Sequence, residues 1–346
     1  MNNIQILRIG LFQMAAGGLS VIFLGILNRV MRVELGIDLM VVSLLVGGGH
    51  YLGALVAIPF GHYSDTHRIA GYRRTIYIII GTIVTTTVLV LAPHMAVWIS
   101  ADTTIFRIIT AFMFFLLEGI STFLAGTAYL ALIADLTKSK ERGSAAGLVW
   151  TLLMIGIIIT GITAASYMEN YSFNRIIILC SSASVIALIM SLIALWKQEN
   201  RSNEKIVQTE SLLNAFNAMI SIKTTRHFAI FLLIGMFSFF MQDVILEPFG
   251  GEVFNLSTAE TTRFNSFMGI GLVSAMLFGG IYLTPRIGKH KLTTLGCWII
   301  AASFAGLAVS GFTGNGQVLN PIISLLGLGA GFFTVGSIAL MMDLTA

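Results

Sequence analysis

The chain has 346 residues, of which 56% are hydrophobic and only 10% are charged, and its mean hydropathy is +0.89. These values exclude an ordinary soluble globular domain, in which about a quarter of the residues are charged, and they predict an integral membrane protein. The formal net charge of +4 does not indicate nucleic-acid binding, because the basic residues fall in short loops between apolar runs, where they act as topology signals.

Unbroken apolar runs recur along the whole chain. Each has about the 20 residues that a helix needs to cross a hydrocarbon core, and none shows the alternation of barrel strands. We therefore expect an all-α, polytopic transmembrane helical bundle in a lipid bilayer. The first run should remain as a membrane helix, because no small-residue cleavage site follows it. The ten predicted spans are 9–28, 40–61, 75–98, 105–134, 144–165, 174–196, 227–248, 264–285, 292–312 and 320–342.

Basic residues divide unevenly between the two sides of the predicted bundle. If the N-terminus is cytoplasmic, all but five of the 20 lysine and arginine residues fall on the cytoplasmic side, as the positive-inside rule requires. We therefore expect a cytoplasmic N-terminus. The five residues expected outside are Arg29, Arg32, Arg107, Arg175 and Arg263.

The longest polar stretch, residues 197–226, divides the chain into two halves. The N-terminal half, 1–196, has six predicted membrane helices, and the C-terminal half, 227–346, has four. Within the linker, residues 212–220 carry apolar side chains at helical spacing. This pattern predicts either a short helix in the cytoplasmic interface or a plain tether whose apolar residues touch the bundle.

The two halves repeat each other in sequence. The string LALIADLT at 130–137 corresponds to IALMMDLT at 338–345, which makes Asp135 and Asp343 equivalent positions. We therefore expect two pseudo-repeats arranged in parallel, with six helices in the first and four in the second.

The segment 61–74, GHYSDTHRIAGYRR, is a polar island between two predicted spans. Gly61 allows close helix contact, and Asp65 can pair with a basic residue or cap a helix N-terminus. This arrangement resembles the loop between helices two and three of the major facilitator superfamily. The resemblance implies a conformational latch on one face of the bundle; the alternative is a loop that acts only as a topology signal. The latch residues are Gly61, Asp65, Arg73, Arg74, Asp135 and Arg142.

A second polar stretch, 242–263, begins inside the seventh predicted helix. Asp243 and Glu247 lie one helical turn apart and share a face, and Pro248 with the two following glycines is expected to break the helix just beyond them. Ionisable groups at membrane depth usually face the bundle interior or a water-filled cavity. We therefore predict an outer vestibule formed by Gln242, Asp243, Glu247, Pro248, Gly250, Gly251 and Glu252.

Three strings together resemble the PucC-type branch of the major facilitator superfamily. They are QDVILEPFGGEVFNLS at 242–257, RIGLFQMAAGGLSVIFLGILNRVMRVELGI at 8–37 and SDTHRIAGYRR at 64–74. The resemblance extends from 8 to 345. It implies a factor that assists the assembly of light-harvesting complexes by handling or delivering (bacterio)chlorophyll. It also implies antenna polypeptides and tetrapyrrole pigment as partners, no enzymatic activity, and a place in the cytoplasmic, intracytoplasmic or thylakoid membrane of a phototrophic bacterium.

Two ionisable residues inside predicted spans leave alternatives open. His50, in VGGGHYLG, either ligates a chlorophyll magnesium, with the glycines leaving room for a flat macrocycle, or forms a hydrogen bond across helices. Glu118 is either a proton-coupling carboxylate or is neutralised by an interhelical hydrogen bond. The alternative function is therefore a proton-coupled secondary transporter of a small solute. The sequence has no evident nucleophile and base pair and no metal-ligand cluster.

Overall fold

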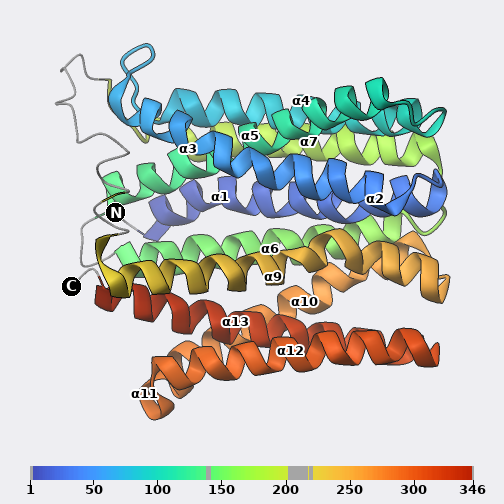
Figure 1. Ribbon diagram of the computed structural model, residues 1–346. Helices are drawn as coiled ribbons and strands as arrows, with labels where there is room; N and C mark the ends of the chain where they lie inside the picture. Colours follow the sequence, from blue (N-terminus) through green and yellow to red (C-terminus); the bar gives the residue numbers. More distant parts are fainter. Residues whose placement is uncertain (1–2, 138–141, 202–216, 218–220, 345–346) are drawn as a thin grey trace. The chain divides into compact units, whose positions relative to one another are not determined.

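The described part of the computed structural model consists of helices joined by turns and short loops (Figure 1). Within that part no β-strand is present, and one isolated backbone bridge joins Ile69 and Tyr72. The described residues are 3–137, 142–201, 217 and 221–344.

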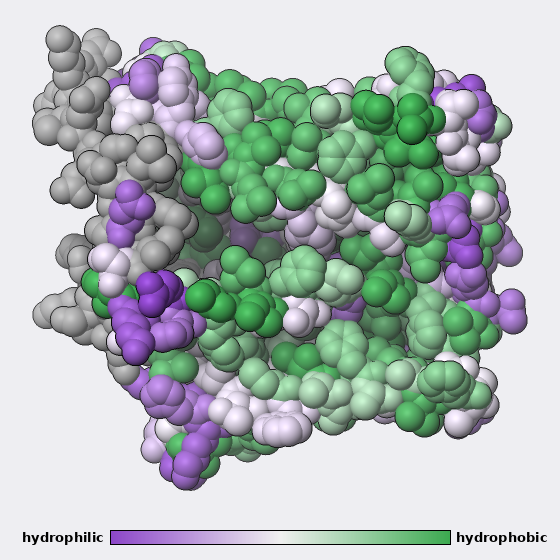
Figure 2. Space-filling view, in the orientation of Figure 1, coloured by the Kyte–Doolittle hydropathy of each residue, from purple (hydrophilic) through white to green (hydrophobic). Residues whose placement is uncertain are grey.

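Within the described residues, nine helices are long and apolar enough to cross a membrane, which confirms the predicted all-α membrane bundle. Figure 2 shows hydrophobic side chains over the middle of the helices and hydrophilic ones gathered at their ends. The span predicted at 264–285 is not among the nine. Its helix begins earlier, at Thr258, and is less apolar because Glu260 and several threonines and serines lie on it.

The chain forms two compact units, Met1–Thr209 and Glu210–Ala346. The division falls inside the predicted linker, 197–226. The choice between an interfacial helix and a tether concerns residues 212–220, which lie outside the described residues except for Asn217. Each unit is considered by itself below.

The first unit contains six long helical stretches, two of which include π-helical segments. Such segments have a wider turn than an α-helix and often mark functional sites. In chain order the elements are α1 (Asn3–Ser20), η1 (Val21–Leu27), η2 (Val30–Glu34), α2 (Leu39–Val42), η3 (Ser43–Gly49), α3 (His50–Thr66), α4 (Thr75–Ser100), α5 (Ile105–Leu136), α6 (Arg142–Tyr167) and α7 (Phe173–Leu195).

Helix α5 is central to one side of the first unit. It packs on both α3 and α4, while α1 packs on α6 and α7, and α4 also contacts α7. Figure 1 shows α3, α4 and α5 running alongside one another. The fully buried residues Ile22, Ile26, Leu45 and Phe115 belong to the apolar core at this level. This core surrounds the polar site described below.

The second unit repeats part of this packing. Helix α13 packs on α10 and α12, just as α5 packs on α3 and α4. This agreement supports the repeat predicted from Asp135 and Asp343, which lie near the ends of α5 and α13. The elements of the second unit are α9 (Lys223–Phe254), α10 (Thr258–Phe278), η5 (Gly279–Leu283), α11 (Thr284–Ile287), α12 (Lys289–Thr313), η6 (Gly316–Val318) and α13 (Leu319–Leu344).

The predicted break of the seventh span at Pro248 is wrong. Helix α9 continues through Pro248 as far as Phe254 and ends where Asn255 adopts the left-handed conformation, with φ of 54°. A proline removes one hydrogen bond from a membrane helix without ending it when neighbouring helices support the backbone. Here α10 supplies that support, since a Cβ on Gly250 would lie 2.7 Å from the ring of Phe264.

Candidate functional site

His50 and Glu118 meet in the interior of the first unit. His50 is the first residue of α3 and directly follows η3, and its backbone N–H donates to the carbonyl oxygens of Val46 and Gly47. Its Nδ1 atom lies 2.5 Å from Oε2 of Glu118. The two residues are only 6% and 3% exposed. The structure thus joins two ionisable residues that the sequence marked separately.

Glycines bring α3 and α5 into backbone contact beside this pair. A Cβ on Gly119 would lie 2.1 Å from the backbone oxygen of His50, and one on Gly53 would lie 2.4 Å from the backbone of Gly119. A Cβ on Gly49 would lie 3.0 Å from the side chain of Phe115. The room that we expected for a flat macrocycle is therefore taken by α5. Ligation of a chlorophyll magnesium by His50 stays a prediction.

A chain of hydroxyl groups extends the pair toward α4. Thr122 donates to Oε1 of Glu118 at 2.8 Å, and its hydroxyl lies 3.0 Å from that of Thr85 on α4. Ser121 lies 2.8 Å from Thr85 and donates to the backbone oxygen of Glu118 at 2.8 Å. These contacts supply the hydrogen bonds that polar groups need where water is absent. The carboxyl group of Glu118 thus has one interhelical contact, with His50 of α3, and one hydrogen bond within α5, from Thr122; whether Glu118 couples protons stays a prediction.

Aromatic rings surround the imidazole of His50. The ring centres of Tyr51, Phe123 and Phe23 lie 5.0, 5.1 and 5.7 Å from it, and Phe115 lies 5.4 Å from Phe23. Phe23 belongs to η1, so two π-helical segments border the site. An apolar lining lowers the local dielectric constant, which strengthens the contact between His50 and Glu118 and penalises any uncompensated charge. Chemically, the arrangement is a buried imidazole and carboxyl pair joined to hydroxyl groups of α4 and α5.

Part of the predicted latch comes together where α3 ends and α4 begins. Arg74 is 6% exposed, and its Nε atom lies 3.5 Å from Oδ2 of Asp135. Its guanidinium also donates to the hydroxyl of Ser64 at 3.2 Å, and Ser64 donates to the backbone oxygen of Gly61 at 2.7 Å. The structure therefore connects Gly61, Arg74 and Asp135, with Ser64 as a link that the sequence did not suggest.

The other predicted latch residues are placed differently. Asp65 lies near the end of α3 and Arg142 is the first residue of α6, but their side chains lie outside the described part. Arg73 takes part through its backbone N–H, which donates to the carboxylate of Glu199 at 2.5 Å.

Glu199, which follows α7, is a member of this cluster that sequence reasoning missed. Its carboxylate accepts hydrogen bonds from the backbone N–H groups of Arg73, Arg74 and Thr75, the last at 2.8 Å, and from the Thr75 hydroxyl at 2.8 Å. The unpaired N–H groups and the dipole at the start of α4 favour an anion there. Burial raises the pKa of Glu199, but these hydrogen bonds outweigh burial and hold the pKa below its usual value.

The predicted vestibule residues lie on α9 in the second unit. Gln242 donates its side-chain amide to Asp243, and Asn265 of α10 donates to Oε1 of Glu247 at 2.5 Å. Gln242 and Glu247 are each only 3% exposed. Pro248, Gly250 and Gly251 are also buried, and Glu252 is exposed in the last turn of the helix. The structure thus adds Asn265, which the sequence did not mark.

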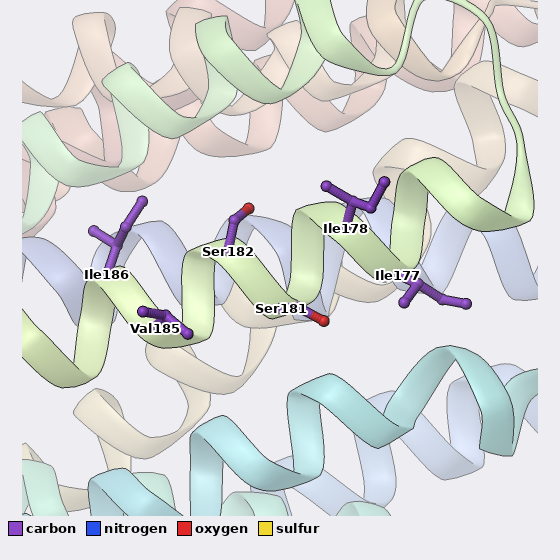
Figure 3. Close-up of a pocket in the computed structure, with 6 residues that line it drawn as sticks. All are labelled: Ile177, Ile178, Ser181, Ser182, Val185 and Ile186. Atoms are coloured by element: carbon purple, nitrogen blue, oxygen red, sulfur yellow. The ribbon is translucent and has the colours of Figure 1, made fainter.

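A shallow depression runs along α7 (Figure 3). All of its lining residues belong to this one helix, so it is an open apolar surface, and we assign no site to it. Among the residues that the structure describes, no group of three or more His, Cys, Asp or Glu side chains is arranged to hold a metal ion. The depression is lined by Ile177, Ile178, Ser181, Ser182, Val185 and Ile186.

A protein family and several bacterial proteins resemble this chain over most of its length. A protein-family model described as "PUCC protein" matches residues 26–346. Protein PucC of Cereibacter sphaeroides is 31% identical over 361 residues, which cover 98% of this chain and 76% of that protein. A Rhodobacter capsulatus protein named "Bacteriochlorophyll synthase 44.5 kDa chain" is 29% identical over 349 residues, which cover 99% of this chain and 79% of that protein.

Solved structures of membrane transporters share the fold. The xylose transporter XylE from E. coli, in a partially occluded inward-open conformation, superposes with a TM-score of 0.69 at 14% identity, covering 98% of this chain and 87% of that one. A structure of the nucleoside transporter NupG gives a TM-score of 0.68 at 14% identity, covering 98% of this chain and 83% of that one. At this identity the likeness shows the fold alone, which is the major facilitator fold that the 61–74 loop predicted.

Proposed function

The chain belongs to the PUCC protein family, and from that premise we propose that it assists the assembly of light-harvesting complexes by handling or delivering (bacterio)chlorophyll. Family membership over nearly the whole chain is the observation that carries the proposal. The name of the Rhodobacter capsulatus relative, which contains bacteriochlorophyll synthase, supports the pigment part. The proposed partners are antenna polypeptides and tetrapyrrole pigment, with the pigment as cargo. No enzymatic step is part of the proposal.

The physical character of the chain suits an apolar cargo. A tetrapyrrole with a long hydrocarbon tail stays in lipid, and the exposed side chains of the membrane helices offer apolar surface to it. On α7, for example, Ile178, Val185 and Ile186 are 54%, 58% and 56% exposed. Such exposed apolar surface is normal for a protein in a bilayer. It is compatible with an apolar cargo, but it does not identify the cargo as a pigment.

Purification from a phototrophic host tests the proposal directly. The full chain is isolated in mild detergent, its absorption spectrum is recorded and the co-purifying polypeptides are identified. We expect bound chlorophyll-type pigment together with antenna polypeptides. A colourless protein without such polypeptides contradicts the proposal.

A pair of histidine variants tests whether His50 takes part in pigment binding. His50→Gln removes the imidazole in the interior of the first unit, and His94→Gln is the matched control, because His94 also lies on a membrane helix but is exposed. If His50 ligates the pigment magnesium, His50→Gln shifts or abolishes the pigment absorption while His94→Gln leaves it unchanged. Equal spectra for the two variants rule out ligation by His50.

We further propose that the N-terminus is cytoplasmic, in an inner membrane of a phototrophic bacterium. The distribution of basic residues supports this orientation. Single cysteines replacing the exposed residues His67 and Glu169, in a background without Cys180 and Cys297, test it. A membrane-impermeant thiol reagent added from outside should label position 169 and not position 67. The reverse pattern contradicts the orientation.

A proton-coupled secondary transporter is the alternative function. The buried carboxyl groups of Glu118 and Glu247 favour it, and the solved structures with this fold are transporters. Under this alternative Asp243→Asn abolishes pH-dependent uptake while the protein still inserts. Under the assembly proposal the same change lowers the amount of antenna complex in the cell instead, so the two readouts separate the functions.

A further inference from the structure

We infer that the backbone carbonyl oxygen of Leu55, on the exposed face of α3, is an axial ligand for the magnesium of a (bacterio)chlorophyll. The inference rests on the proposed function and names the place on the chain where the pigment binds. It assigns the ligand to the outer face of α3 and not to His50, beside which α5 already packs.

A proline in the interior of α3 removes one backbone hydrogen bond. The helix runs from His50 to Thr66, and Pro59 lies inside it. Because proline has no N–H, the bond that residue 59 would donate to the carbonyl oxygen of Leu55 cannot form. None of residues 52–61, LGALVAIPFG, has a polar side chain that supplies another donor. The oxygen of Leu55 therefore lacks its regular helical partner.

This oxygen lies on an exposed apolar face of α3. A helical carbonyl points along the axis toward the residue four positions later, so this one lies between the side chains of Leu55 and Pro59. Leu52, Leu55 and Tyr63 are 44%, 63% and 49% exposed, and Pro59 is exposed as well. Their spacing of three and four residues places them on one side of the helix. The face thus combines apolar side chains with one backbone acceptor that the helix does not satisfy.

The other two prolines inside helices of the described structure are buried. Pro93 of α4 and Pro248 of α9 lie among packed side chains, where neighbouring helices can support the backbone. Leu55, in contrast, lies within the candidate membrane span Leu39–Gly61, about 9 Å along the axis from its end. At that depth no water replaces the missing donor, so the unsatisfied oxygen is unfavourable and favours a ligand.

The magnesium of a chlorophyll matches this surface in chemistry. It is a hard cation that prefers oxygen ligands, and the macrocycle leaves a coordination position open on its face. The rest of the pigment is a flat ring and a hydrocarbon tail, which suit the apolar side chains along α3. A lipid acyl chain covers the same side chains but has no group that binds the oxygen of Leu55.

Titration of pigment into the full chain tests the assignment. Bacteriochlorophyll a and bacteriopheophytin a, which lacks the magnesium, are added separately to the purified protein in mild detergent, and absorption reports binding. We expect the magnesium pigment to bind about tenfold or more tightly. Pro59→Leu restores the N–H and keeps an apolar side chain on the face, so it should abolish this preference. Pro93→Ala, at a buried proline, is the control and should retain it.

The outcomes separate this inference from the proposed function. If neither pigment binds to the unaltered protein, the proposed function fails and the inference fails with it. If pigment binds but Pro59→Leu keeps the preference for magnesium, only the inference is overturned. Loss of the preference in His50→Gln alone assigns the ligand to that imidazole. Loss of antenna polypeptides from purified Pro59→Leu, with an unchanged pigment titration, overturns the inference in favour of a polypeptide partner.

Thermal unfolding shows that a loss of binding does not come from a damaged fold. Pro59→Leu and Pro59→Ala should both unfold at a temperature at least as high as the unaltered protein, because each restores a helical hydrogen bond. Lower unfolding temperatures in both variants contradict the missing bond at Leu55 and overturn the inference.

Discussion

Glu199 is joined to Thr75 by two hydrogen bonds, one from the backbone N–H and one from the hydroxyl, each 2.8 Å long. Because Glu199 follows α7 and Thr75 begins α4, the contact holds two helix ends together. Glu199→Ala should lower the free energy of unfolding by about 1 kcal/mol, as loss of an N-terminal helix cap does. Thermal unfolding in detergent measures it. The control Glu169→Ala, at an exposed loop position, should have little effect; equal effects of both changes contradict the prediction.

The lowered pKa of Glu199 gives its contribution a defined pH dependence. Hydrogen bonding to the carboxylate holds the folded-state pKa below the usual value of 4.5. The stabilisation is therefore complete above about pH 4.5 and is lost as the pH falls through the lower folded-state pKa. The difference in unfolding temperature between the unaltered protein and Glu199→Gln should stay constant near neutral pH and shrink in acid. A difference that grows in acid contradicts this assignment.

The close approach of Gly119 to the backbone of His50 makes α5 intolerant of a methyl group at that position. Gly119→Ala should destabilise the first unit by about 1–3 kcal/mol or more, because the clash is with backbone atoms that cannot move aside easily. Gly126→Ala should be neutral or slightly stabilising, since alanine favours a helix. Thermal unfolding of the two variants side by side provides the measurement. Similar losses in both contradict the packing argument.

The tight turn between α3 and α4 contains a strained residue. Ala70 has φ of 53° and Gly71 has φ of 82°, between the bridged residues Ile69 and Tyr72. A side chain at positive φ costs about 1 kcal/mol, so Ala70→Gly should raise the unfolding temperature while Gly71→Ala should lower it. If Ala70→Gly instead destabilises the protein, the turn does not adopt this conformation in solution.

In the second unit, Asn265 supports the buried carboxyl group of Glu247. Asn265→Ala removes a hydrogen bond of 2.5 Å inside the contact between α9 and α10, and it should cost about 1–3 kcal/mol. Asn320→Ala, at an exposed position near the start of α13, is the control. Proteolysis and thermal unfolding report the difference; no loss in Asn265→Ala means that Glu247 does not depend on this contact.

The sequence predicted the bundle well because each membrane helix can be recognised from its own run of apolar residues between two polar loops. The continuation of α9 through Pro248 was missed because contacts with α10 decide it, through Gly250 and Phe264.

Contacts between side chains that are far apart in the chain could not be predicted from the sequence either. His50 and Glu118 were each recognised as ionisable residues at membrane depth, but they are 68 residues apart, and only the packing of α3 on α5 brings them together. Glu199 lies in a polar linker among other charged and polar residues. No pattern in the neighbouring sequence indicated its contact with Thr75, which lies 124 residues earlier. Local sequence patterns therefore identified some residues of the candidate sites, but only the tertiary structure shows which residues they contact.

The π-helical segment η3 takes up about one extra residue directly before α3. Its turns hold about one residue more than those of an α-helix, and each residue of an α-helix accounts for about 100° of rotation. His50 is the first residue after this segment. In a regular α-helix the extra residue would rotate α3 by about 100°, whereas the wider turn takes it up. Deleting one residue between 43 and 49 should therefore convert the segment to ordinary α-helix and leave the side chains of α3 facing their present neighbours.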